Sequence, residues 1–107
     1  MSYVVRWSAD AEHDLDAIAD YIAAHDSLER AQYVIDKILD AAGSLTTLPD
    51  KGNYPKELGA FGNREFRQIF FEPYRLIYQA AGKRVTVMLV ADGRRDMLAL
   101  LAKRLLG

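Results

Sequence analysis

The chain has 107 residues, the length of a single domain, and half of them are hydrophobic and 27% charged, as in a folded globular protein. The absence of cysteine excludes disulfide frameworks, cysteine-ligated zinc, iron–sulfur clusters and thiol catalysis. The formal net charge of −1, taken alone, argues against a protein that binds nucleic acid.

The N-terminus and the apolar segments bear on location. No apolar run follows a basic segment at the start of the chain, and the sequence turns acidic by Asp10, so we expect no signal peptide. The longest nearly uncharged apolar run, residues 85–91, is about a third of the ~20 residues that a membrane helix needs. We therefore expect a cytoplasmic protein without a membrane partner.

The first elements are a short strand and a helix. The strand is predicted where Tyr3, Val5 and Trp7 alternate with their neighbours. Ser8 can cap the helix that follows, and its apolar residues recur at spacings of three and four. This stripe consists of Ala11, Leu15, Ile18 and Ile22. The acids between them, including Asp14, lie off the stripe, and we expect them on the solvated face.

A second helix is predicted to start at Asp26, or with Ser27 as the alternative cap, and to end before Pro49 and Gly52. Its apolar stripe is more regular than that of the first helix, and we expect each stripe to be buried against the other helix or against a sheet. The stripe consists of Leu28, Ala31, Ile35, Ile38, Ala42 and Leu45. The short break between the two helices predicts an antiparallel hairpin.

The second half of the chain has the pattern of a sheet. Residues 49–63 hold two prolines and three glycines, which predicts an ordered loop with a helical turn near residues 56–58. Strands are predicted at 65–71, 74–80 and 84–91, the last a continuous apolar run typical of a central strand. A last helix at 97–106 is apolar almost all round, so part of it should meet another segment or a partner.

These elements follow the order β-α-α-β-β-β-α. We predict an α+β fold in which an N-terminal strand, an antiparallel helical hairpin and a short C-terminal helix accompany a mostly antiparallel sheet. A single domain is expected over residues 1–107.

Residues for acid–base or metal chemistry are few. The two histidines, His13 and His25, are separated by about 18 Å along a helix, so they cannot share a metal ion. The sequence contains no HExxH, GxxxxGK[ST], GxGxxG or GxSxG motif. We therefore expect neither a metal site nor a cofactor.

The neutral total conceals a separation of charge along the chain. Residues 1–53 carry four basic and ten acidic residues, a balance of −6, whereas residues 54–107 carry ten and five, a balance of +5. The arginines near the predicted strands are Arg64, Arg67, Arg75, Arg94 and Arg95. They can attract phosphate or an acidic partner, or alternatively form surface pairs with the acids of the sheet.

Aromatic residues accompany these arginines. Tyr74 and Tyr78 share strand parity, and Arg67 is expected on the same side across the hairpin. Such a group can stack on bases or anchor a protein partner. The alternative is a pair of core tyrosines whose hydroxyl groups are hydrogen-bonded at the rim of the sheet.

Three segments resemble the ParE/RelE superfamily of toxins from type II toxin–antitoxin systems in their order and spacing. They are LPDKGNYPKEL at 48–58, REFRQIFFEPYRLIY at 64–78 and VMLVADGRRD at 87–96, and the helical hairpin before them also matches. The resemblance implies a plasmid-stabilisation type of toxin that inhibits growth and is neutralised by a cognate antitoxin. The antitoxin is expected to be of the ribbon–helix–helix type with an extended tail. The toxin is expected to form a homodimer, or a heterotetramer with this antitoxin.

The superfamily implies two alternative activities. ParE-like members bind and poison DNA gyrase, whereas RelE-like members are ribosome-dependent mRNA endoribonucleases. Several RelE-like branches use a histidine near the end of the last strand, where this chain has Asp92 and no later histidine. We therefore favour a gyrase-binding toxin, which is not an enzyme. A member that only binds its antitoxin is the third alternative.

Each activity implies its own residues. In the RNase alternative, Arg67, Arg75 and Arg94 bind phosphate and Tyr74 orients the nucleophile. In the favoured reading, the surface for the target and the antitoxin is larger and includes apolar residues of the last helix. It consists of Arg64, Arg67, Arg75, Tyr78, Arg94, Arg95, Leu98 and Leu101.

Overall fold

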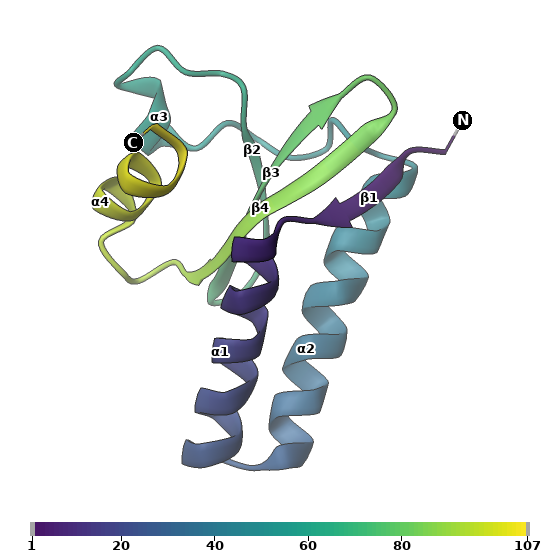
Figure 1. Ribbon diagram of the computed structural model, residues 1–107, viewed down its shortest axis with the longest axis vertical. Coiled ribbons are helices and arrows are strands. Elements are labelled where there is room, and N and C mark those ends of the chain that lie inside the picture. The colour runs from purple at the N-terminus through teal and green to yellow at the C-terminus, as the bar shows by residue number, and fades with distance from the viewer. Residues whose placement is uncertain (1, 107) are drawn as a thin grey trace.

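The computed structural model describes residues 2–106 (Figure 1). These residues form β1 (Val4–Trp7), α1 (Ala9–His25), α2 (Leu28–Gly43), the 3₁₀ turn η1 (Ser44–Thr46), α3 (Lys56–Gly59), β2 (Arg67–Phe71), β3 (Tyr74–Ala81), β4 (Arg84–Asp92), α4 (Met97–Leu101) and the π-helical turn η2 (Ala102–Leu106). The predicted α+β class and the order of its elements are confirmed. None of the helices described here is both long enough and apolar enough to cross a membrane.

The four strands form one sheet in the order β1-β4-β3-β2. The strands β2, β3 and β4 pair antiparallel, whereas β1 pairs parallel with β4, so that Val4 lies beside Arg84. The predicted mostly antiparallel sheet is therefore confirmed. The N-terminal strand joins an edge of this sheet next to a strand from the other end of the chain (Figure 1).

Each helix of the hairpin begins after a serine that caps its N-terminus. The Ser8 hydroxyl oxygen accepts a hydrogen bond from the amide of Ala11 at 3.1 Å, and that of Ser27 accepts one from the amide of Arg30 at 3.0 Å. Ser27, rather than Asp26, is thus the cap of α2. Each cap satisfies an amide that the helix itself leaves without an acceptor.

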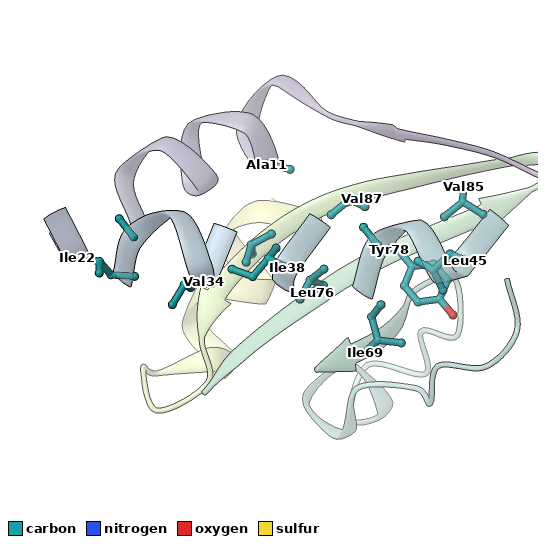
Figure 2. Close-up of a cluster of buried hydrophobic side chains, with 13 residues drawn as sticks. Ala11, Ile22, Val34, Ile38, Leu45, Ile69, Leu76, Tyr78, Val85 and Val87 are labelled. Atoms are coloured by element: carbon teal, nitrogen blue, oxygen red, sulfur yellow. The ribbon is translucent and has the colours of Figure 1, made fainter. Parts of the chain in front are cut away.

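The first core lies between this hairpin and one face of the sheet (Figure 2). Most of the predicted stripe of α2 is buried, but its first member, Leu28, is 78% exposed. Val34, which is not part of the predicted stripe, is only 3% exposed and belongs to this core. Leu28 is the first residue of α2, and this end of the hairpin lies beyond the sheet (Figure 1). No strand is there to cover Leu28, so the expectation that it is buried is corrected.

A second core fills part of the opposite face of the sheet. It lies beneath α3 and α4 and consists of Leu58, Phe66, Ile77, Leu89, Ala91, Met97 and Leu101. Because α3 has four residues and α4 has five, they cover only one end of this face. The other end, where β1 lies, is left open.

Asp14 of α1 connects three elements, which corrects the expectation that it lies on the solvated face. Its side-chain oxygen Oδ2 accepts a hydrogen bond from the amide of Val90 in β4 at 3.1 Å. The same oxygen lies 2.5 Å from an Arg104 guanidinium nitrogen in η2. A half-buried carboxylate thereby holds the C-terminal turn and the sheet against α1.

The long loop before β2 is attached to the core through Tyr78. The Tyr78 hydroxyl donates a hydrogen bond to the carbonyl oxygen of Pro49 at 2.7 Å and accepts one from the amide of Gly52 at 3.0 Å. A β-carbon on Gly52 would lie 2.6 Å from the Gln68 carbonyl oxygen and 2.7 Å from the Tyr78 hydroxyl. Only glycine therefore fits this approach of the loop to the sheet.

Gly52→Ala is expected to lower the free energy of unfolding by about 1–3 kcal/mol, because the new methyl group separates the loop from Tyr78 and Gln68. Gly43→Ala is the matched control, since a β-carbon there meets nothing within 4 Å. Gly43 has helical dihedral angles, so alanine should instead stabilise the protein by about 0.5–1 kcal/mol. Urea unfolding followed by circular dichroism measures both changes, and equal effects would contradict this account.

Candidate functional site

The residues predicted for the functional surface lie in separate environments. Some are buried on either side of the sheet, two lie against the long loop, and three gather where β4 ends. The buried ones are Arg75, Tyr78 and Leu101. Leu98 lies on α4 and is 50% exposed.

Arg75 on β3 lies beneath α3 and is only 8% exposed. Its guanidinium group binds Glu57 of α3 through two hydrogen bonds of 2.8 and 2.9 Å, and its Nε donates to the Gln68 side chain at 2.9 Å. The hydrogen bonds from Arg75 hold the pKa of Glu57 below its usual value. The positive charge of Arg75 is therefore neutralised inside the protein.

Tyr78 and Leu101 are fully buried, on opposite faces of the sheet. Arg67 pairs with Tyr78 across the β2–β3 hairpin, which confirms that they share a side of the sheet. Burial raises the pKa of the Tyr78 phenol. Tyr78 thus matches the alternative of a core tyrosine whose hydroxyl is hydrogen-bonded at the rim (Figure 2).

Arg67 and Arg64 surround Tyr54 at the edge of the sheet formed by β2. The Arg67 guanidinium donates hydrogen bonds to the Gly52 carbonyl oxygen at 2.8 Å and to the Tyr54 hydroxyl at 3.0 Å. Its central carbon lies 4.5 Å from the centre of the Tyr54 ring, and that of Arg64 lies 5.3 Å from it. Arg67 is half-buried and holds the loop, whereas Arg64 is exposed.

Tyr74, Arg94 and Arg95 gather at a hollow of about 450 Å³ between α1 and the end of β4. We call it the strand-end hollow. Tyr21 and Ile22 of α1 also line it and, with Tyr74, extend it into a neighbouring hollow of about 270 Å³. Three of the predicted residues are thus brought together with an exposed tyrosine of the helical hairpin.

The charges of the strand-end hollow are partly paired. The Nε of Arg94 donates to Asp92 Oδ1 at 2.9 Å, and one of its terminal nitrogens lies 2.5 Å from Asp92 Oδ2. These hydrogen bonds lower the pKa of the Asp92 carboxyl group. Burial raises the pKa of Tyr74, and the Asp92 charge adds to this rise. Arg95 is exposed and forms no ion pair with any acid among residues 2–106.

Sequence reasoning missed Tyr21 and Glu57. Tyr21 lies three residues after Ile18, so the helical spacing placed it next to the buried stripe, and this signal was present in the sequence. Glu57 reaches Arg75 only because α3 folds back over the sheet, and no local pattern indicates that contact. No group of three potential metal ligands occurs in the part of the chain that the structure describes.

Comparison with known proteins supplies the family. A family model described as the ParE toxin of the type II toxin–antitoxin system parDE matches residues 5–97. No curated relative matches the sequence. The fold is similar to the chromosomal ParDE system of P. aeruginosa, with a TM-score of 0.71 and 19% identity over 85% of this chain and 96% of that chain.

It is also similar to the RelBE2 toxin–antitoxin complex of Mycobacterium tuberculosis, with a TM-score of 0.61 and 18% identity over 86% of this chain and 92% of that chain. At these identities, the two solved structures show a shared fold and nothing finer. The family model is decisive because it extends from β1 to the first residue of α4. The chain therefore belongs to the ParE toxin family of type II toxin–antitoxin systems.

Proposed function

We propose that this toxin inhibits growth by binding and poisoning DNA gyrase and that a cognate antitoxin neutralises it. The observation that carries the choice of target is the state of Arg75 and Arg94. An endoribonuclease of the RelE type would need these arginines on the scissile phosphate. Here a carboxylate already binds each of them, Glu57 in the first case and Asp92 in the second.

The free energy needed to separate each arginine from its carboxylate differs between the two pairs. Arg75 and Glu57 have side chains that are only 9% and 13% exposed, and breaking a buried pair from one side costs about 3–5 kcal/mol. Arg94 is 78% exposed and its pair with Asp92 is easier to open, but Asp92 still repels an approaching phosphate. Binding without phosphoryl chemistry fits this arrangement better than RNA cleavage.

The antitoxin is proposed to contact the C-terminal part of the chain. The solved systems that the fold resembles are named as a toxin–antitoxin system and a toxin–antitoxin complex. Leu98 is 50% exposed on α4, and Arg95 precedes that helix without an acidic partner among the described residues. An apolar and acidic tail of a ribbon–helix–helix antitoxin would match both residues.

Purified toxin at micromolar concentration is expected to stop the supercoiling of relaxed plasmid by gyrase, or to accumulate cleaved complex. Arg95→Ala should raise the concentration for half-inhibition about tenfold, as the loss of an interface anchor does. Lys103→Ala removes the same charge from an exposed position on η2 and should leave inhibition unchanged. Agarose gels of the reaction products measure both.

Gyrase that is unaffected by the toxin would overturn the proposal. Primer extension on translating mRNA provides the complementary readout, and we expect intact message. Cuts in the ribosomal A site that disappear in Arg94→Ala would instead support the endoribonuclease alternative.

The pairing of Arg75 can be tested through stability at different pH. Glu57→Gln should lower the free energy of unfolding by about 3–5 kcal/mol at pH 7, since it leaves the buried charge of Arg75 without its carboxylate. The hydrogen bonds from Arg75 hold the folded pKa of Glu57 below its ordinary value, so its stabilisation is complete above the unfolded pKa and is lost as the pH falls through the folded pKa. The difference between variant and wild type in urea unfolding should therefore shrink in acid. A difference independent of pH would contradict the pairing.

Leu98→Asp is expected to weaken the complex with the antitoxin at least tenfold, because it places a charge in an apolar contact. Leu28→Asp is the matched control, since Leu28 is 78% exposed at the far end of the hairpin. Titration of each purified toxin with the product of the adjacent antitoxin gene measures the affinity. Equal losses for both variants would place the antitoxin elsewhere.

A further inference from the structure

The open end of the sheet carries positive charge that is not part of the surface predicted for the target and the antitoxin. On the face opposite the helical hairpin, a hollow of about 470 Å³ is lined by Val4 and Arg6 of β1, Gln79 and Ala81 of β3, Lys83, and Arg84 and Thr86 of β4. A second hollow of about 500 Å³ continues it past Arg6, Gln79 and Thr86. We call the two together the open basic face.

The cations of this face are available to a partner. Arg6, Lys83 and Arg84 are exposed, and none of them forms an ion pair with an acid within residues 2–106. The Nε of Arg6 makes one 3.3 Å hydrogen bond, to the Thr86 hydroxyl. No acidic residue of the described part of the chain lines either hollow. This differs from the strand-end hollow, where Asp92 holds Arg94.

The fold brings these cations together and points them in one direction. Val5 and Trp7 pack on the first core, so Val4 and Arg6 alternate onto the opposite face. In the parallel pair of β1 and β4, Val4 lies opposite Arg84 and Arg6 lies opposite Thr86. The Cα atoms of Arg6 and Arg84 are therefore diagonal neighbours about 8 Å apart. The guanidinium groups of Arg6 and Arg84 therefore extend from the same face, close enough to contact one nucleic-acid backbone.

The lining chemistry decides between classes of partner. A protein partner is held mainly by apolar anchors in pockets, and single-stranded nucleic acid by stacking on aromatic rings. The apolar residues of the first hollow are Val4 and Ala81. The second hollow adds Trp7, Ala9 and Met88, but Trp7 and Met88 are half-buried and pack against the two cores. The polar groups that line the two hollows are guanidinium, ammonium, amide and hydroxyl groups, which are the groups that bind the phosphates of duplex DNA.

We propose that the open basic face binds the phosphate backbone of duplex DNA without reading its sequence. The opposite layer of the protein carries the acids of α1 and α2 and repels DNA, so the molecule approaches with this face first. The inference rests on the proposed function in one respect, since the DNA concerned is the segment held by gyrase.

Fluorescence anisotropy of a short labelled duplex of arbitrary sequence, titrated with toxin at low salt, tests the proposal directly. We expect weak binding. The logarithm of the association constant should fall linearly with the logarithm of the salt concentration, with a slope near −3, which is about −0.9 for each of three phosphate contacts. The triple variant Arg6→Gln, Lys83→Gln, Arg84→Gln should bind at least tenfold more weakly, and its slope should approach zero.

The matched control removes the same charge elsewhere, with Lys37→Gln, Lys56→Gln and Lys103→Gln at exposed positions outside both hollows. It should retain most of the affinity, and urea unfolding checks that both triple variants are folded. Three results would overturn the proposal. They are wild-type toxin that does not bind the duplex, equal losses in both variants, and tighter binding of polyglutamate or of single-stranded RNA than of the duplex.

The assay contains no gyrase, so its outcome is independent of the supercoiling test. DNA binding that is lost in the triple variant, together with gyrase that wild-type toxin leaves unaffected, would retain this inference and reject the proposed target. Inhibition of supercoiling by a toxin that does not bind DNA would retain the proposed target and reject this inference.

Discussion

The whole molecule depends on the burial of β3 from both sides. Leu76, Ile77 and Tyr78 are consecutive and all fully buried, although neighbouring strand residues point to opposite faces. The sheet must therefore be covered twice, by the helical hairpin on one face and by α3 and α4 on the other. In these 107 residues, the elements that cover the second face, α3 and α4, are short, and they extend over only one end of it.

Because α3 and α4 cover only part of this face of the sheet, some of its arginines are buried and paired, whereas others are exposed. Where α3 lies on the sheet, Arg75 is buried and must be neutralised, and Glu57 of that same helix supplies the carboxylate. Where no helix lies on the sheet, Arg6 and Arg84 remain in solvent, and burial imposes no need for a partner. Whether an arginine of this protein holds the fold together or is available to a ligand thus follows from its position relative to α3 and α4.

The sequence predicted the elements well because each one carries a local signal. The spacing of apolar residues indicated both helices, and alternation with turn residues indicated the strands. The burial of Leu28 was mispredicted because its exposure depends on how far the hairpin extends past the sheet. The site was harder to predict for the same physical reason. The contact of Arg75 with Glu57, and the meeting of Arg6 with Arg84, arise from tertiary placement that no single segment encodes.

The parallel pairing of β1 with β4 also governs when the protein can complete its fold. Residues that touch across this pair, such as Arg6 and Thr86, are 80 positions apart in the chain. During synthesis β1 emerges before β4 and has no neighbour in the sheet until β4 has been translated. Pairing across so long a separation is slow to form, and a nascent or truncated chain that ends before β4 lacks both β1's partner and the open basic face. The edge of the sheet formed by β1, and with it the open basic face, is therefore completed only after β4 has left the ribosome.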